Sequence, residues 1–219
     1  MRSPGNYLLL FFVALLLILF IQIQIFSLVL SKLGLSPDSA ALLLITTLFG
    51  SAVNLPLAKI KAQAPPEPPP QPQLPDYWPF KMPPFTGYTV IAINVGGAMV
   101  PILFSLYLFL SQPLPLPTVL LAIAIVSAIS YGFSRPVAGL GIGMPIFIAP
   151  LTAAITALLL APEHSPPLAY ICGTLGVLIG ADLLRLKDIP QLGTPIASIG
   201  GAGTFDGIFF TGIIAVLLA

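Results

Sequence analysis

Charged residues are scarce in this sequence. Asp, Glu, Lys and Arg make up only 7% of its 219 residues, against about 25% in an ordinary soluble domain, whereas hydrophobic residues make up 57%. This balance excludes an ordinary soluble globular domain. The net charge of +1 offers no basic field that could hold a nucleic-acid backbone, so we expect no nucleic acid among the partners.

Cysteine and histidine are scarcer still, with one residue of each, Cys172 and His164. A single cysteine excludes a disulfide framework and a multi-cysteine cluster, and a single histidine argues against a histidine-rich metal site. His164 follows Glu163 in a short polar stretch that we interpret as a solvated outer loop. We therefore predict no metal site and no cofactor.

Long apolar runs dominate what remains. A bilayer core about 30 Å thick requires about 20 apolar residues per helix, and seven stretches come close to that length: 7–30, 39–57, 88–110, 117–134, 140–160, 167–184 and 198–219. The sequence therefore predicts an all-α fold, a polytopic transmembrane helix bundle of about seven spans in contact with the lipid bilayer. Glycine and proline interrupt the fifth span, and the seventh ends with the chain, so either could be partly re-entrant. A prokaryotic cell membrane or an internal membrane is the expected location.

The cations indicate an orientation for this bundle. Seven of the eight fall at the amino terminus or in the loops after the second, fourth and sixth spans: Arg2, Lys59, Lys61, Lys81, Arg135, Arg185 and Lys187. Lys32 alone falls on the other side. The positive-inside rule then predicts a cytoplasmic amino terminus and a carboxyl terminus outside.

A proline-rich stretch divides the chain. Ten prolines lie between Ala64 and Pro84, and proline fixes φ and removes a donor, so this stretch is expected to be extended polyproline II. The predicted division is a two-helix hairpin over 1–58, a cytoplasmic linker over 59–87 and a five-helix domain over 88–219. The linker is either a semi-rigid tether or a ligand for a proline-recognition domain.

Two aspartates are the candidate chemical groups, since ionisable residues in apolar segments are costly. Asp182 closes the sixth predicted span and Asp206 opens the seventh, so both should lie near the cytoplasmic boundary. Two carboxyl groups that share a poorly hydrated site retain one proton between them and can act as general acid and general base on a water. We predict Asp182 and Asp206 as a candidate catalytic pair.

Other residues support or compete with this pair. At 100° per residue, Gly203, Asp206 and Gly207 cluster on one helical face, where another backbone can approach, whereas Asp182 projects away from the glycine-rich face of its helix. In the structural alternative, Asp182 pairs with Arg185 on the same helical face, and Asp206 caps its helix or pairs with Arg135 or Arg185. Asn94 either bonds to a neighbouring helix or lines a polar cavity.

The carboxyl-terminal half carries two resemblances. Residues 173–176, 180–184 and 197–207 resemble a family of uncharacterised prokaryotic multi-pass membrane proteins, known only as a domain of unknown function, over about residues 90–219. The order and sidedness of the two aspartate-bearing helices are also remotely similar to the intramembrane aspartyl proteases of the presenilin, signal-peptide-peptidase and prepilin-peptidase type. That second resemblance implies that Asp182 and Asp206 are catalytic.

Three functions follow as hypotheses. The first is an intramembrane aspartyl protease-like enzyme with membrane-protein substrates. The second is an accessory or scaffold subunit of a larger membrane complex, with the proline-rich loop as its contact. The third is a proton- or ion-coupled transporter, suggested by Asn94, Pro101, Pro145 and Pro150 within apolar helices.

Overall fold

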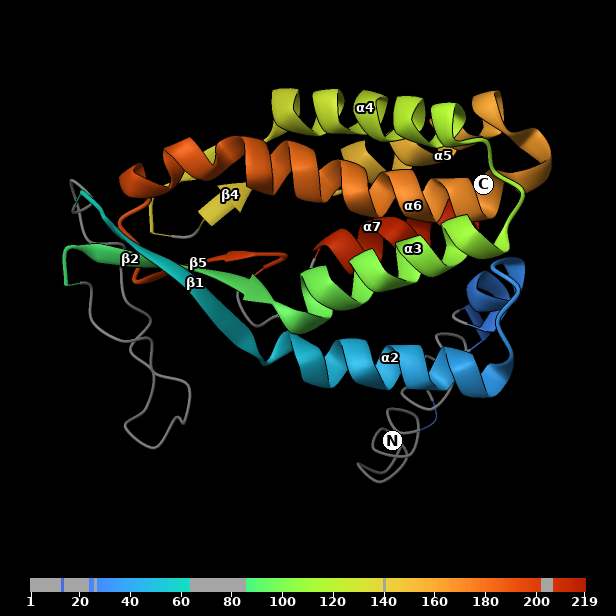
Figure 1. Cartoon of the computed structure of the whole chain (residues 1–219), viewed down its shortest axis with the longest axis horizontal. Helices are drawn as coiled ribbons and strands as arrows, with labels where there is room; N and C mark the ends of the chain where they lie inside the picture. The colour runs from blue at the N-terminus through green and yellow to red at the C-terminus, as the bar shows by residue number, and fades with distance from the viewer. Residues whose placement is uncertain (1–12, 14–23, 26, 64–85, 140, 202–206) are drawn as a thin grey trace, which may run out of the picture.

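The computed structural model describes residues 13, 24–25, 27–63, 86–139, 141–201 and 207–219. It combines apolar helices with two small sheets (Figure 1). The first sheet has the order β1-β2-β5, formed by β1 (Asn54–Lys61), β2 (Tyr88–Asn94) and β5 (Ile196–Ile199). β1 runs antiparallel to β2, and β5 runs parallel to β2. The second is an antiparallel hairpin of β3 (Arg135–Val137) and β4 (Gly141–Gly143).

The helices lie to one side of the three-stranded sheet (Figure 1). Residues 27–32 are helical and precede α2 (Pro37–Ser51), α3 (Val100–Ser111), α4 (Leu116–Phe133), α5 (Ile148–Leu160), α6 (Ser165–Val177) and α7 (Gly207–Leu218). Two π-helical segments, η1 (Val95–Met99) and η3 (Leu178–Asp182), precede α3 and follow α6, and the 3₁₀ segments are η2 (Pro162–His164) and η4 (Leu183–Gln191).

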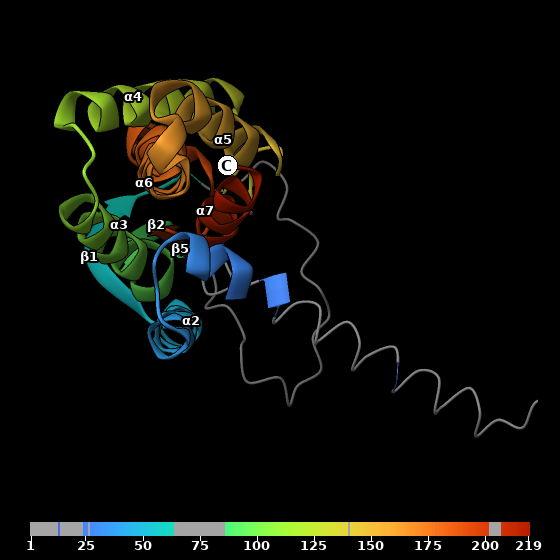
Figure 2. The ribbon, with the colours of Figure 1, turned by 90° about the vertical axis from the view of Figure 1, so that its right-hand side faces the viewer.

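The central helix is α6, which contacts α3, α4, α5 and α7 (Figure 2). Tyr170 and Leu168 of α6 are fully buried, and they belong to one hydrophobic cluster with Leu108 of α3, Val126 of α4 and Phe209 of α7. Two glycines allow the close approach of α4. A Cβ at Gly176 would lie 2.6 Å from the Cβ of Val126, and one at Gly180 would meet the carbonyl of Ser127. These glycines therefore act as packing positions.

The predicted all-α bundle of about seven spans is wrong. The predicted helix over 117–134 agrees with α4, but the stretch over 39–57 ends in β1 and the stretch over 88–110 begins with β2. The stretch over 140–160 contains β4, and the stretch over 198–219 begins with the last two residues of β5. An apolar run does not distinguish a buried strand from a helix by hydropathy. The β-branched residues of β2 and β5 fit the pleated surface of a sheet, and their pairing partners are distant in sequence.

Length also contradicts the seven-span prediction. Within the described ranges, two helices are long and apolar enough to cross a membrane: Leu116–Phe133 and the continuous helical stretch Pro162–Gln191. Shorter apolar helices cover Val95–Ser111, Ile148–Leu160 and Ile208–Leu218. The stretch Pro162–Gln191 is largely buried within the protein, as the core helix of a soluble protein would be. Helix length alone thus gives weak evidence of membrane association, and a multi-pass topology is not supported by it.

Two glycine-containing turns, one after β2 and one after β5, lie against each other. Each of the parallel strands β2 and β5 is followed by a Gly-Gly pair, Gly96-Gly97 after β2 and Gly200-Gly201 after β5. The two turns approach so closely that a Cβ at Gly97 would meet the carbonyl oxygen of Gly200. Gly200 has φ +83°, a conformation that glycine adopts without strain.

The predicted proline-rich linker over 59–87 lies mostly outside the described residues.

Candidate functional site

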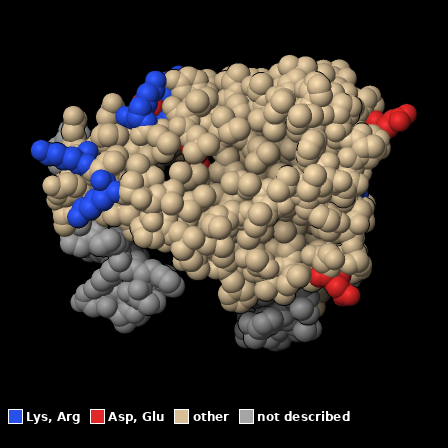
Figure 3. Space-filling view, viewed as in Figure 1, with Lys and Arg blue, Asp and Glu red and all other residues tan. Residues whose placement is uncertain are grey.

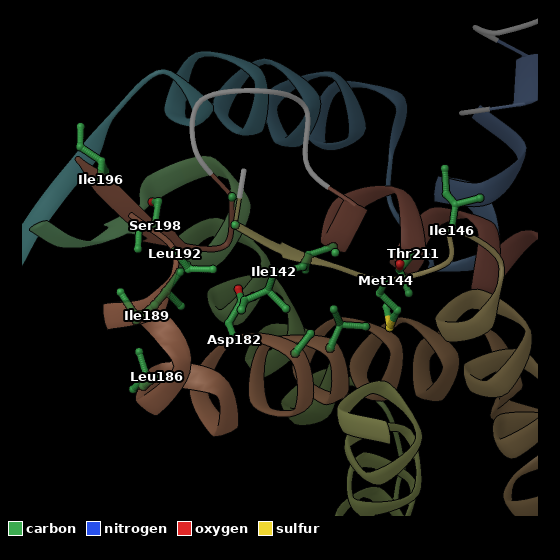
Figure 4. A pocket seen from close by; sticks show the side chains of 18 residues that line it. Ile142, Met144, Ile146, Asp182, Leu186, Ile189, Leu192, Ile196, Ser198 and Thr211 are labelled. Atoms are coloured by element: carbon green, nitrogen blue, oxygen red, sulfur yellow. The ribbon is translucent and has the colours of Figure 1, made fainter. Parts of the chain in front are cut away.

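A cavity of about 430 Å³ opens between the hairpin strand β4, the edge of β5 and the start of α7 (Figure 4). Its walls are mostly apolar, with Ile142 and Met144 on the hairpin side and Ile189 and Leu192 on the side of η4. Among the described residues, three polar side chains line it: Asp182, Ser198 and Thr211. This part of the chain therefore places one carboxylate and two hydroxyl groups in apolar surroundings.

Asp182 is the last residue of the π-helical segment η3. Its side chain is half-buried, lines the cavity and accepts a hydrogen bond from the backbone N–H of Gly200 across 2.7 Å at Oδ2. Gly180, two residues earlier, packs against Ser127 of α4. The end of this helix thus places its small residue on the packing face and its carboxylate in the cavity. This hydrogen bond positions the carboxylate relative to the turn after β5.

The second predicted aspartate, Asp206, lies outside the described residues, as does Gly203. The described residues on either side are informative. Gly201, the last before residues 202–206, and Ile208, in the first turn of α7, both line the same cavity as Asp182. Gly207 is the first residue of α7. The described chain therefore lines the cavity with Asp182 both just before residues 202–206, at Gly201, and two residues after them, at Ile208.

Arg185 forms its ion pair with Asp188, with Nη1 and Oδ2 3.1 Å apart. Its guanidinium also closes the carboxyl end of α4: Nη2 donates to the carbonyls of Tyr131 and Ser134 at 2.8 Å and 2.7 Å, and Nε donates to Ser134 Oγ. The group stacks over the Tyr131 ring, 4.2 Å from its centroid. Arg185 therefore fixes η4 to the end of α4. Arg135 is exposed on β3, outside the residues that line this cavity.

Asn94 is buried at the end of β2 and bonds to three segments of the chain. Its Oδ1 accepts the N–H of Gly97 across 2.6 Å, and its Nδ2 donates to the carbonyl of Ser51, the last residue of α2, and to Oδ1 of Asn54 in β1. Ser198, which lines the cavity from β5, donates to the same oxygen of Asn54. This network joins the cavity wall to both neighbouring strands.

Sequence reasoning missed Asn54 and Ser198. Asn54 is the first residue of β1, and Ser198 lies within β5. The two residues are 144 positions apart in the sequence, so no local spacing relates them. Burial in β2 shows no regular alternation either, since the buried residues Thr89, Ala92 and Asn94 are three and two positions apart. Local periodicity therefore offered no signal that Asn94 ends a strand.

A comparison with protein families identifies the chain. The family model of the proteins of unknown function DUF1614 matches residues 48–218. The protein belongs to the DUF1614 family. The match includes all three strands of the larger sheet and every residue that lines the Asp182 cavity, so the cavity is part of the DUF1614 domain. The curated proteins and the solved structures yield no match.

The chemistry available at this site in the DUF1614 protein is that of carboxyl and hydroxyl groups. Over the described part of the chain, no group of three His, Cys, Asp or Glu residues is placed to hold a metal ion. A carboxylate in a mostly apolar cavity can accept a proton from a water or a bound molecule. A second carboxyl group beside it would complete the acid and base pair of aspartic-protease chemistry.

Proposed function

We propose that this DUF1614 protein is embedded in a lipid bilayer and hydrolyses a peptide bond in membrane-protein substrates, with Asp182 and Asp206 as acid and base. The observation that carries the enzymatic part is the cavity of about 430 Å³, which Asp182, Gly201 and Ile208 line together. Ile208 is two residues after Asp206, and two residues of chain span at most about 7 Å. Contact between the two carboxyl groups is therefore within reach of the covalent chain.

The distribution of charge supports the membrane part of the proposal. Blue Lys and Arg side chains gather at the end that holds the sheet, red acidic side chains appear at the opposite end, and the face between them shows few charged side chains (Figure 3). Large apolar side chains are exposed on several helices, with Phe49 of α2 72% exposed, Leu110 of α3 74% and Leu159 of α5 77%. Exposed apolar side chains of this size suit contact with lipid.

The position of the sheet is consistent with this orientation. β1 is an edge strand, and an open sheet edge does not occur in contact with hydrocarbon, because its free N–H and C=O groups would lack partners. Lys59 and Lys61 lie at its exposed carboxyl end. The sheet therefore belongs at the level of the headgroups or in water. By the positive-inside rule, this end faces the cytoplasm.

The enzymatic proposal is tested in proteoliposomes that hold the full chain and internally quenched peptides, each with one apolar segment of about 20 residues. We expect cleavage by the unchanged protein and by Asp38→Asn, since Asp38 lies in the first turn of α2 at the opposite end. Asp182→Asn and Asp206→Asn should each lower the rate by about 10²–10⁴-fold, the usual contribution of a general acid or base. Equal thermal melting of the four proteins establishes that folding is retained. Undiminished cleavage by either variant, or none by the unchanged protein, would overturn the enzymatic proposal.

A second test measures proximity without a substrate. In the double variant Asp182→Cys and Asp206→Cys, a mild oxidant should form a disulfide, because that bond requires Cβ atoms about 3.5–4.5 Å apart. Cys172 does not interfere, since it is fully buried in α6. The control pairs Asp206→Cys with Asp38→Cys. Bridging of the control but not of the Asp182 variant would contradict a carboxyl pair.

A further inference from the structure

A second, shallower groove lies on the other side of the β3–β4 hairpin, with a volume of about 370 Å³. It lies between the carboxyl end of α4 and the hairpin, and Phe133, Val137, Met144 and Pro145 provide its apolar lining. Arg135 lines it as well. Gly143 and Met144 line this groove and also the Asp182 cavity, so one strand separates the two spaces.

Arg135 is the group that distinguishes this groove. Its side chain is exposed, and over the part of the chain that the structure describes it makes no hydrogen bond or ion pair. Arg185 in η4 differs, because its guanidinium pairs with Asp188 and donates to two backbone carbonyls. An unsatisfied guanidinium beside exposed apolar side chains, with Phe133 51% and Val137 40% exposed, suits a ligand that is anionic at one end and apolar at the other.

The groove also lies at the level that such a ligand would occupy. The backbone N–H of Gly139, in the turn of the hairpin, donates to the carbonyl of Leu192, and Gln63, just after β1, donates to Pro190. These bonds join the hairpin and the cationic end of β1 to the same stretch of chain around η4. Arg135 therefore shares one end of the molecule with Lys59, Lys61 and Lys187, while the apolar surface of α4 begins directly beside it.

We propose that this groove binds an anionic phospholipid, with the phosphate on Arg135 and the first part of an acyl chain against Phe133 and Val137. Guanidinium groups bind phosphate through paired hydrogen bonds, and juxtamembrane cations attract anionic lipids. The inference rests on the membrane part of the proposed function and is independent of hydrolysis at Asp182. The bound lipid would cover the outer side of β4, whose inner side forms the wall of the Asp182 cavity.

The groove offers a variant that fills it without disturbing the fold. Gly132 lines the groove from α4, and a Cβ at this position would meet no atom within 4 Å. Gly132→Leu therefore places a bulky side chain in open space, and leucine favours helix over glycine. The matched charge control is Lys61→Gln, which removes an exposed cation at the same end of the molecule but outside the groove.

The test is native mass spectrometry of the full chain in detergent, titrated with phosphatidylglycerol or with zwitterionic phosphatidylcholine. We expect the unchanged protein to retain phosphatidylglycerol preferentially. Arg135→Gln should weaken that binding by about fivefold, the usual effect of one cation near an anionic lipid, and Gly132→Leu should weaken it at least as much. Lys61→Gln should change it by less than about twofold, because this side chain lies outside the groove.

Each outcome decides the proposal. Equal retention of the two lipids by the unchanged protein would overturn it, as would an equal loss for Lys61→Gln and Arg135→Gln, which would indicate a diffuse cationic surface. If Arg135→Gln lowers the melting temperature, two other measurements still decide the question. They are the binding of phosphatidylglycerol by Gly132→Leu, and the loss of the preference for phosphatidylglycerol by the unchanged protein at high salt. If the chain is monodisperse without detergent, membrane insertion itself is contradicted. That result differs from equal retention of the two lipids, which contradicts only the lipid site. Neither measurement depends on peptide cleavage.

Discussion

Asp182 and Gly200 are joined by a hydrogen bond of 2.7 Å from the backbone N–H of Gly200 to Oδ2 of Asp182. The bond connects the last residue of η3 to the turn that follows β5. Because that turn also packs against Gly97, the position of the carboxylate depends on the close approach of two glycine-containing turns. Substitutions in these turns should therefore affect both stability and the Asp182 cavity.

The first prediction concerns Gly200→Ala. The φ of +83° is unfavourable for alanine, and a Cβ would lie 2.6 Å from the backbone N of Ala98. Gly87 provides the control, since its φ is +81° but a Cβ there meets nothing within 4 Å. Gly87→Ala should lower the free energy of unfolding by about 1–2 kcal/mol, the cost of the left-handed conformation alone, and Gly200→Ala by more. Thermal melting in detergent measures both, and equal losses would show that the two turns do not touch.

The second prediction concerns the packing of α6 against α4. Gly176→Ala would place a Cβ 2.6 Å from the Cβ of Val126, and such overpacking typically costs about 1–3 kcal/mol. Gly132→Ala, in α4, fills open space and should be neutral or stabilise the protein by up to about 1 kcal/mol through helix propensity. A melting temperature that falls for Gly132→Ala and not for Gly176→Ala would contradict the packing described for these helices.

The third prediction separates the two roles of Arg185. Arg185→Lys keeps the positive charge but loses the planar group that bonds to Tyr131 and Ser134 and stacks on the ring. Because hydrogen bonds from charged groups contribute about 1.5–3 kcal/mol, this variant should be clearly destabilised. Asp188→Asn removes the charge of the ion pair but leaves an amide oxygen that can still accept a hydrogen bond from Arg185 Nη1, so it should cost less than Arg185→Lys. Chemical denaturation compares the two, and a larger loss for Asp188→Asn would show that the ion pair dominates.

The fourth prediction concerns the polar network around Asn94. Asn94→Ala leaves the buried N–H of Gly97 and the carbonyl of Ser51 without this partner, and each unsatisfied buried group costs about 1–3 kcal/mol. Ser198→Ala removes one donor from Asn54, whose Oδ1 still accepts from Asn94, so its cost should be smaller. Both are measured as shifts of the melting temperature. A loss for Ser198→Ala as large as that for Asn94→Ala would place the critical bond on the β5 side.

The helices show what local pattern can predict. The apolar run predicted over 117–134 is α4 (Leu116–Phe133) within one residue at each end, because a long run with proline at its start and no other breaker favours helix. The prediction of a helix over 88–110 was wrong for its first seven residues, where Tyr88–Asn94 forms β2. Periodicity and hydropathy do not separate the two states over so few residues, and pairing of β2 with β5 joins positions about a hundred residues apart.

The sequence by itself determined the apolar character of the chain, the position of α4, the carboxylate at the end of the central helical stretch and the glycines that allow close packing. These depend on composition and on neighbours a few positions away. Only the tertiary structure decided that four apolar stretches contain strands, that Asp182 faces a cavity and binds Gly200, and that Arg185 closes α4 while Arg135 has no partner among the described residues. The physical reason is that strand pairing and polar contacts join residues distant in sequence, and local hydropathy carries no information about which of them meet.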